Sequence, residues 1–404
     1  MNNPHLTRWG VVFLTLGAGI VVAFQVGKLP ATIPVLRDEL GISLVTAGWV
    51  VSLIYVASAI TGLIAGAVSD MIGARRVVVA GVVCVGVASF GGAFADGAAT
   101  LLISRFFEGI GAATVFVAGP LLVFRAVAAK DMRFAFGLWG SYMPAGIAIM
   151  LLLTPPLLDW VGWRGLWIVN AAILVVYAPI LVAGTRSVPD AGRPGPRLGA
   201  ASLAGDIKAV ARSRGPLLLA VCFGTYSLMY LCLSAFLPTF LIETRGFAAD
   251  WAAIVTALVV AANAFGNIFG GWLLQRGVPR GLLIGSAAAT MGVTAWLVYQ
   301  PWTGAVGSVF LAFVFSYFGG MLPPSVMSGS PVHAPGQNRI GTTNGLIMQG
   351  VNIGQLSGPP AFAAIVSVGG WSAGPLLGVA AATASVAAAI GIARIEARHV
   401  RAAG

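Results

Sequence analysis

The sequence predicts an all-α integral membrane protein with twelve transmembrane helices in two six-helix lobes. Of its 404 residues, 58% are hydrophobic and only 9% are charged, and the mean hydropathy is +0.93. A soluble domain carries about 25% charged residues, so this composition excludes a soluble protein. Two further observations support the prediction: apolar stretches of membrane-spanning length, and a repeat at half the length of the chain.

The repeat occurs at two nearly equal offsets. One set recurs 208 residues later: Gly137, Gly146, Gly162 and Trp163 match Gly345, Gly354, Gly370 and Trp371 (345 − 137 = 208). A second set recurs 204 residues later: Leu29, Ala31, Pro34 and Glu39 match Leu233, Ala235, Pro238 and Glu243 (233 − 29 = 204). A parallel duplication in so apolar a chain is typical of a transporter in which each lobe carries one copy.

Apolar stretches of about 20 residues mark the spans. We expect them at residues 9–33, 46–66, 77–95, 100–124, 135–157, 165–184, 215–241, 249–272, 281–299, 303–328, 341–367 and 373–394. With both termini cytoplasmic, all of the 23 Lys and Arg residues fall on the inner side except Lys28, Arg37, Arg105, Arg164 and Arg245. This asymmetry follows the positive-inside rule, so the net charge of +11 sets the topology and indicates no nucleic-acid partner.

The first apolar stretch begins at Trp9 and is longer than a signal-peptide core, so we expect a retained span and a bacterial inner-membrane protein. The long polar interruption at residues 186–214 is rich in basic residues and proline. It predicts a cytoplasmic linker, with a short helix near 202–212, between an N-terminal lobe at 1–185 and a C-terminal lobe at 215–404.

The usual groups for catalysis are missing from the sequence. The three cysteines lie in apolar segments, which argues against a disulfide framework or a zinc site. No HExxH, GxGxxG, GxxxxGK[ST] or GxSxG pattern occurs. We therefore expect no enzyme, no cofactor and no metal. A non-transporting membrane receptor remains as a remote alternative, although receptors usually add a soluble domain.

Two motifs resemble those of a known family. Gly66, Asp70, Gly73, Arg75 and Arg76 form a G-x-x-x-D-x-x-G-x-R-R pattern between the second and third spans, and the fourth span carries Arg105-Phe-Phe-Glu108-Gly109. The first pattern resembles the signature loop of the major facilitator superfamily, and the second resembles that family's R-x-x-[QE]-G pattern. With the twelve spans and the central linker, the resemblance covers essentially the whole chain. It implies alternating access, with spans one, four, seven and ten lining the cavity.

The resemblance also implies a cytoplasmic latch formed by Gly66, Asp70, Gly73, Arg75 and Arg76, in which Asp70 accepts hydrogen bonds. A tight turn without a latch function is the alternative. In the second half Leu274 occupies the acidic position, so the latch would be one-sided. Span five lacks the G-P-x-x-G-G pattern of the family's exporters. Its Met143-Pro144-Ala145-Gly146 stretch, with Gly162-Trp163-Arg164, resembles the cyanate/nitroimidazole-transporter-like branch.

Three ionisable residues lie well inside the spans, away from their ends: Lys28, Arg105 and Glu108. Such groups are costly in a membrane and mark functional sites by default. Lys28 and Arg105 lie at similar depth, and the three together carry a charge of +1, so these two cations are candidate ligands for an anionic substrate. Glu108 is the candidate proton carrier. Two alternatives stay open, because Lys28 could snorkel to the outer interface and Arg105 could form a structural bridge with Glu108.

The second half offers neutral polar groups instead. Tyr226 and Tyr230 share a face of span seven, and Gln349 and Asn352 lie three residues apart on span eleven. Their polar groups need partners in a membrane, which makes them candidate substrate contacts; hydrogen bonds between helices are the alternative.

Together these observations predict a monomeric secondary active transporter for a small anionic organic or inorganic solute, coupled to protons through Glu108. The alternative is a proton-coupled efflux pump for drugs or amphipaths, which the aromatic content favours.

Overall fold

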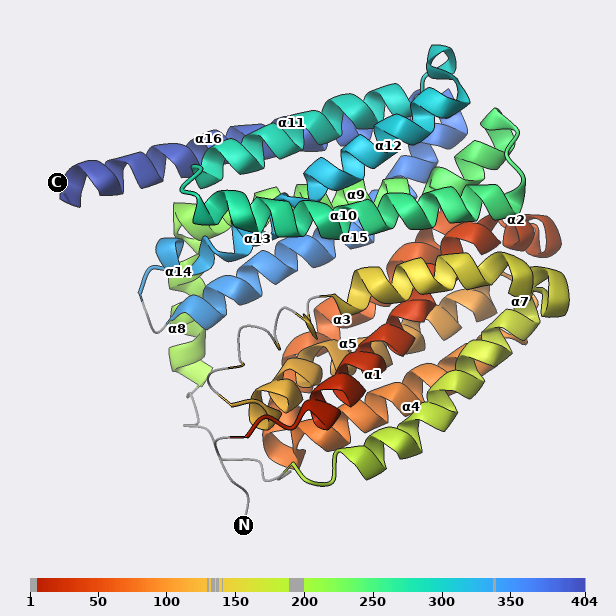
Figure 1. The fold of residues 1–404 in the computed structure, drawn as a ribbon, viewed down its shortest axis with the longest axis horizontal. Coiled ribbons are helices and arrows are strands. Elements are labelled where there is room, and N and C mark those ends of the chain that lie inside the picture. Colours follow the sequence, from red (N-terminus) through yellow and green to blue (C-terminus); the bar gives the residue numbers. More distant parts are fainter. Residues whose placement is uncertain are drawn as a thin grey trace. The chain divides into compact units, whose positions relative to one another are not determined.

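The computed structural model describes residues 6–128, 131, 135, 138–139, 141–188, 200–336 and 339–403. Within these helices, the side chains of residues 57–58, 61–68, 70–71, 200–204, 206, 341 and 399–403 lie outside the described set. Contacts divide the chain into two compact units, residues 1–196 with 249–257 and residues 197–248 with 258–404. The regular elements of the described residues are all helices (Figure 1).

The first unit is a helical bundle. Its helices are α1 (Trp9–Gly27), α2 (Leu29–Leu40), α3 (Leu44–Ile72), α4 (Ala74–Gly92), α5 (Ala98–Ala126) and α7 (Tyr142–Gly184). Helices α1 and α4 each pack against both α5 and α7, and α3 packs against α5. Lys28 joins α1 to α2 with helical backbone angles, φ −68° and ψ −26°, so the two form a nearly continuous helix.

The second unit repeats this plan with more breaks. Its elements are α8 (Ala200–Ala211), α9 (Arg214–Arg245), α10 (Ala249–Gln275), α11 (Arg280–Val298), η2 (Pro301–Thr303), α12 (Gly304–Gly320), α13 (Leu322–Met327), α14 (Ser330–His333), α15 (Ile340–Gly369) and α16 (Leu376–Ala403). Helix α9 packs against α15 and α16, and α11 packs against α12 and α16 (Figure 1). Residues 249–257 of α10 group with the first unit. Helix α8 lies where the sequence predicts a short helix.

Among the described residues, nine helices are long and apolar enough to cross a membrane. One of them, α7, has 43 residues, and a straight helix of that length would extend about 65 Å, roughly twice the hydrocarbon thickness. It bends at Gly162, whose angles of φ 65° and ψ 178° are not helical, and so supplies two spans. Helices α3 and α15, of 29 and 30 residues, complete twelve. The all-α membrane fold predicted from the sequence is confirmed.

The repeat in the sequence is visible in the backbone. Six of the seven described glycines with positive φ, a conformation that other residues rarely adopt, form matched pairs, and Gly304 (69°) stands outside them. The pairs are Gly41 and Gly246 (62° and 68°), Gly73 and Gly277 (98° and 84°), and Gly162 and Gly370 (65° and 74°), separated by 205, 204 and 208 residues. The chain therefore ends or bends its helices at equivalent points in both units.

A hydrogen bond from an indole to a carboxylate also occurs once in each unit, and we call it the Glu–Trp clasp. Trp163 Nε1 donates to Glu39 Oε2 over 2.7 Å, and Trp371 Nε1 donates to Glu243 Oε2 over 3.2 Å. The four residues belong to the two sets that define the repeat. Each clasp joins the end of the first membrane helix of its unit to the glycine bend.

Close helix packing is duplicated as well. A Cβ atom at Gly146 would lie 2.6 Å from the Ile20 carbonyl oxygen, and one at Gly354 would lie 2.1 Å from the Gly224 carbonyl oxygen. Ile20 and Gly224 are themselves 204 residues apart (224 − 20 = 204). Small residues at these crossings let helix backbones approach closely, which is how helices associate in membranes.

Candidate functional site

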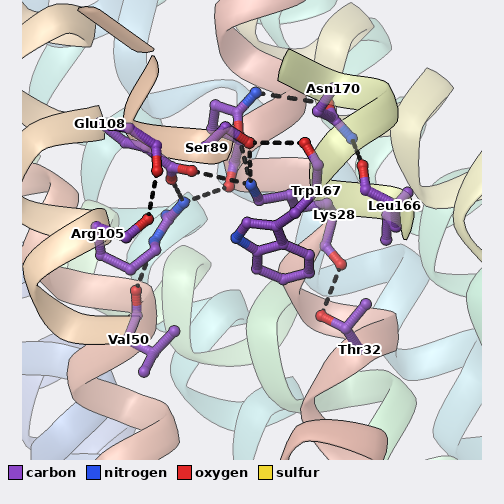
Figure 2. A network of polar contacts seen from close by, with 12 residues as sticks. Lys28, Thr32, Val50, Ser89, Arg105, Glu108, Leu166, Trp167 and Asn170 are labelled. Atoms are coloured by element: carbon purple, nitrogen blue, oxygen red, sulfur yellow. Dashed lines mark hydrogen bonds and ion pairs between the residues drawn. The ribbon is translucent and has the colours of Figure 1, made fainter. Parts of the chain in front are cut away.

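The first unit contains a buried polar cluster, which we call the cation cluster. It consists of Gln25 and Lys28 at the α1–α2 junction, Ser89 on α4, Arg105 and Glu108 on α5, and Trp167 and Asn170 on α7. Their exposed fractions are 0% for all except Asn170, at 1%. In Figure 2 the side chains of Ser89 from α4, Glu108 from α5 and Trp167 from α7 lie around the Lys28 ammonium. The structure thus brings together the three ionisable residues that the sequence singles out.

Lys28 is surrounded by three hydrogen-bond acceptors. Its Nζ lies 2.5 Å from Gln25 Oε1, 3.1 Å from Ser89 Oγ and 3.0 Å from Glu108 Oε1. The Ser89 hydroxyl donates to the Trp167 carbonyl oxygen over 3.1 Å, which leaves a lone pair of Oγ for the ammonium. An ammonium has three N–H donors, so all three are used. The Trp167 indole ring lies beside them, with its centroid 4.0 Å from Nζ, as a cation–π partner (Figure 2).

Arg105 is held by the other oxygen of the same carboxylate. Its Nη1 pairs with Glu108 Oε2 and donates to the Gln25 carbonyl oxygen over 3.0 Å, while Nε donates to the Val50 carbonyl oxygen over 3.0 Å. Arg105 Nη2 is buried and has no hydrogen-bond partner within the described part of the chain. The same holds for Trp167 Nε1. The cluster therefore keeps unused donors on two of its members.

The charges of the cluster do not cancel. Lys28 and Arg105 share Glu108, so the ionised set carries +1 in a place where no side chain is exposed. Buried ions are tolerated only when they are paired and hydrogen bonded, and this pairing is one negative charge short. Lys28 points to Glu108 and is 0% exposed, so the interpretation of Lys28 as an interfacial snorkel is wrong for this structure.

The side-chain amides of Gln25 and Asn170 form a chain of hydrogen bonds next to Lys28. Gln25 Nε2 donates to Asn170 Oδ1 over a long 3.5 Å, and Asn170 Nδ2 donates to the Leu166 carbonyl oxygen over 2.9 Å (Figure 2). Asn170 Nδ2 also faces Met150 Sδ at 3.8 Å. Sequence reasoning missed Gln25, Ser89, Trp167 and Asn170. One signal could have found Asn170: its repeat partner, 208 residues on, is Gly378, so the amide is confined to one half.

The candidate residues of the second unit form no comparable cluster. Tyr226 is buried and its hydroxyl lies 3.2 Å from Asn263 Oδ1, a hydrogen bond between α9 and α10. Tyr230 stacks on Tyr226 with ring centroids 5.6 Å apart. Gln349 and Asn352 are part-exposed on α15. For Tyr226, the alternative of a hydrogen bond between helices describes the observed contact, and substrate contact stays a prediction for all four.

The structure describes only part of the predicted latch. Gly73 ends α3 with φ 98°, as a tight turn requires, and Arg75 Nη2 donates to the Val182 carbonyl oxygen over 2.9 Å within the same unit. Arg76 Nη1 lies 3.4 Å from the Ile72 carbonyl oxygen. Gly66 and the side chain of Asp70 lie outside the described set. The latch therefore stays a prediction.

Comparison with known proteins identifies the class. The model of the Major Facilitator Superfamily matches residues 15–359. The chain therefore belongs to the major facilitator superfamily, a family of multi-pass membrane transporters for small molecules, as its motifs suggest.

Curated relatives fall into two kinds. The probable sulfoacetate transporter SauU of Cupriavidus necator is 26% identical over 385 residues, with 86% of each chain covered. The puromycin resistance protein pur8 of Streptomyces alboniger is 28% identical over 195 residues, 48% of this chain and 38% of the relative. The uncharacterized transporter YwoD of Bacillus subtilis is 27% identical over 141 residues and matches over 31% of its length. The chain thus spans less than half the length of these last two relatives.

Solved structures show the same fold. Crystal structures of a bacterial homologue of the human lysosomal transporter Spinster superpose with a TM-score of 0.80 in the inward-facing occupied form and 0.77 in the unoccupied form. The former covers 98% of both chains at 16% identity, and the latter covers 95% of this chain and 94% of the other at 17%. At such identities the likeness concerns the fold alone.

Proposed function

We propose that this transporter moves a small anion across the cytoplasmic membrane as a secondary active transporter, and that the cation cluster holds the anion's negative charge. One observation carries the proposal: Lys28 and Arg105 share a single carboxylate, so the buried cluster has an excess charge of +1. Attraction between charges is far stronger in a partly dry site than in bulk water. An anion that reaches the cluster supplies the missing negative charge.

The unused donors suggest where the anion binds. Arg105 Nη2 and Trp167 Nε1 are buried without partners among the described residues, whereas the protons of Lys28 are all used. A buried donor without an acceptor is costly, and a carboxylate or sulfonate oxygen would remove that cost. In this proposal Arg105 contacts the anion and Lys28 supplies charge from behind. Tyr226, Tyr230, Gln349 and Asn352 remain candidates for contacts with the rest of the solute.

Glu108 is the proposed site of proton coupling. Its two oxygens pair separately with Lys28 and Arg105. Protonating this carboxylate would change the charge of the cluster from +1 to +2 and loosen both pairs. Proton binding and anion binding would then favour each other, as coupled transport requires.

The relatives support both candidate functions to different degrees. SauU, described as a probable sulfoacetate transporter, matches over nearly the whole chain, and sulfoacetate is an anion with the oxygens that such a cluster could hold. Drug efflux, the second candidate, rests on pur8, which matches about half of this chain. An efflux site for cationic drugs would need an unpaired acid, and Glu108 is paired twice. We therefore favour the anion.

The test is uptake into proteoliposomes by the wild type and by Lys28→Ala and Arg105→Ala, after thermal stabilisation by a panel of organic and inorganic anions has ranked candidates from sulfoacetate onward. Each substitution leaves a neutral pair, Glu108 with the remaining cation, so both variants should fold. Loss of anion uptake is expected in each. Arg164→Ala is the matched control, because the Arg164 side chain is 49% exposed and lies outside the cluster; its uptake should stay close to that of the wild type.

Wild-type uptake by Lys28→Ala would refute the charge-based site. A switch of this variant toward neutral or cationic solutes would instead favour the efflux function. Lys28→Arg is informative as well, because a guanidinium keeps the charge but cannot place three donors where an ammonium does.

A further inference from the structure

We infer that Asn170 is a positioning residue which, through Gln25, fixes Lys28 as a charged donor and so sets the anion preference of the cluster. The statement about anion preference rests on the proposed function. The statement that Asn170 and Gln25 position Lys28 does not. It concerns α7, from which the sequence suggested no substrate-site residue.

The argument begins at a backbone carbonyl. The Leu166 carbonyl oxygen can only accept, so the amide of Asn170 must turn its NH₂ group toward it, as the 2.9 Å contact shows. The other side of that amide, Oδ1, then faces Gln25. An oxygen can be met only by a donor, so Gln25 turns its own NH₂ group toward Asn170.

The orientation of Gln25 decides what Lys28 meets. With its NH₂ group directed at Asn170, Gln25 presents Oε1 to Lys28 Nζ at 2.5 Å. Amide orientations follow from the network around them. Here the Leu166 carbonyl orients Asn170, and Asn170 and the Lys28 ammonium together orient Gln25. Ser89 and Glu108 present acceptors as well, so each of the three neighbours can accept a proton of an ammonium.

Removing Asn170 releases this constraint. Gln25 Nε2 then loses its acceptor, so one of the two contacts that hold the Gln25 amide in place is gone, and Oε1 is less firmly fixed against Lys28 Nζ. Lys28 would be held less tightly against Glu108, and the excess positive charge would be less well positioned in the cluster. Asn170 acts on the anion only through this chain, because its own donors face Leu166 and Met150.

Two measurements test the inference. The first needs no ligand: the apparent melting temperature of purified protein is compared for Asn170→Leu in the wild-type background and in Lys28→Met. If Asn170 works through Lys28, its effect should be clearly smaller when Lys28 is already absent, because interacting residues are not additive. Equal shifts in both backgrounds would overturn the inference. Thr185→Val is the control, since the buried hydroxyl of this residue, which directly follows α7, donates to the Leu181 carbonyl oxygen, outside the cluster.

The second measurement follows uptake of sulfoacetate and of its neutral analogue sulfamoylacetamide. Asn170→Leu and Gln25→Leu should each raise the KM for sulfoacetate roughly tenfold at nearly unchanged maximal rate, the size expected when one hydrogen bond to a charged group is lost. Uptake of the neutral analogue should not change, and the double variant should be no worse than either single variant. A loss of maximal rate for both solutes would indicate a merely structural role and would overturn the inference.

The two proposals can fail separately. If the wild type does not prefer sulfoacetate to its neutral analogue, sulfoacetate is not the transported anion. The proposed function is then tested with the other anions of the panel. The comparison of melting temperatures still tests the role of Asn170. If the wild type prefers the anion and Asn170→Leu keeps that preference, the anion site stands and the positioning role falls.

Discussion

The two units share the same scaffold, but the interior of the first is charged and polar where that of the second is apolar. In the first unit Gln25, Lys28, Trp167 and Asn170 belong to the cation cluster. Their repeat partners, at offsets of 204 and 208, are Met229, Cys232, Pro375 and Gly378. All four of these partners line an apolar cavity of about 20 Å³ in the second unit. The cavity is thus the counterpart of the cluster with its charges and amides removed.

The contrast separates what the fold needs from what the site needs. The helix-ending glycines, the Glu–Trp clasps and the glycine crossings recur in both units, whereas the charged interior occurs in one. A lobe therefore folds with either interior. Buried ions rarely contribute net stability. A role of the cation cluster in binding, as in the proposed function, would account for its cost, and this argument does not depend on the relatives.

The largest effect is expected when a lysine is placed in the second unit, at the position equivalent to Lys28. Cys232→Lys would bury an ammonium beside Met229 and Pro375, where the cavity offers no carboxylate among its lining residues. An unpaired charge in the middle of a membrane span costs about 3 kcal/mol or more. We expect loss of folded protein, measured by membrane yield and by monodispersity in detergent. Cys232→Met is the matched control, and normal folding of Cys232→Lys would mean that the second interior can accommodate charge.

A smaller effect tests the shared scaffold. Gly146→Ala and Gly354→Ala place a methyl group against backbone oxygen in equivalent helix crossings, at 2.6 Å and 2.1 Å. Overpacking of this kind costs about 1–3 kcal/mol. We expect both variants to lower the apparent melting temperature, and Gly354→Ala to lower it more. Gly271→Ala, where a Cβ meets open space, should be close to neutral. An unchanged melting temperature in both variants would show that these crossings tolerate separation.

The smallest effect concerns the clasps. Trp163→Phe and Trp371→Phe remove one indole hydrogen bond each, which costs about 1 kcal/mol. Trp163 is 1% exposed and its bond is 0.5 Å shorter than that of Trp371, so we expect the larger loss in the first unit. The melting temperatures of the two variants, compared with Glu39→Gln and Glu243→Gln, measure this difference. A larger loss for Trp371→Phe would mean that bond length does not rank the clasps.

The sequence predicts the fold well because its signals are one-dimensional. Hydropathy marks the spans, and the offsets of 204 and 208 identify the repeat that the positive-φ glycines later display. It also finds Lys28, Arg105 and Glu108, because charges within spans are rare enough to stand out.

The rest of the site depends on three-dimensional neighbours. Gln25, Ser89 and Trp167 are residue types that spans commonly contain, and nothing in their spacing shows that α4 and α7 bring them to Lys28. The sequence also does not show how the side-chain amides are oriented. The Leu166 carbonyl determines which way the Asn170 amide turns, and Asn170 together with the Lys28 ammonium determines it for Gln25.

The three acceptors around Lys28 also affect its covalent reactivity. An amine attacks electrophiles with its lone pair, which an ammonium lacks, and Lys28 is in addition 0% exposed among its three acceptors, so reagents in solvent do not reach it. Cyanate, aldehydes and activated esters, which modify exposed lysines readily, should therefore spare this one for as long as its neighbours stay in place. The arrangement that holds the charge of Lys28 thus also protects this side chain from covalent modification by electrophiles.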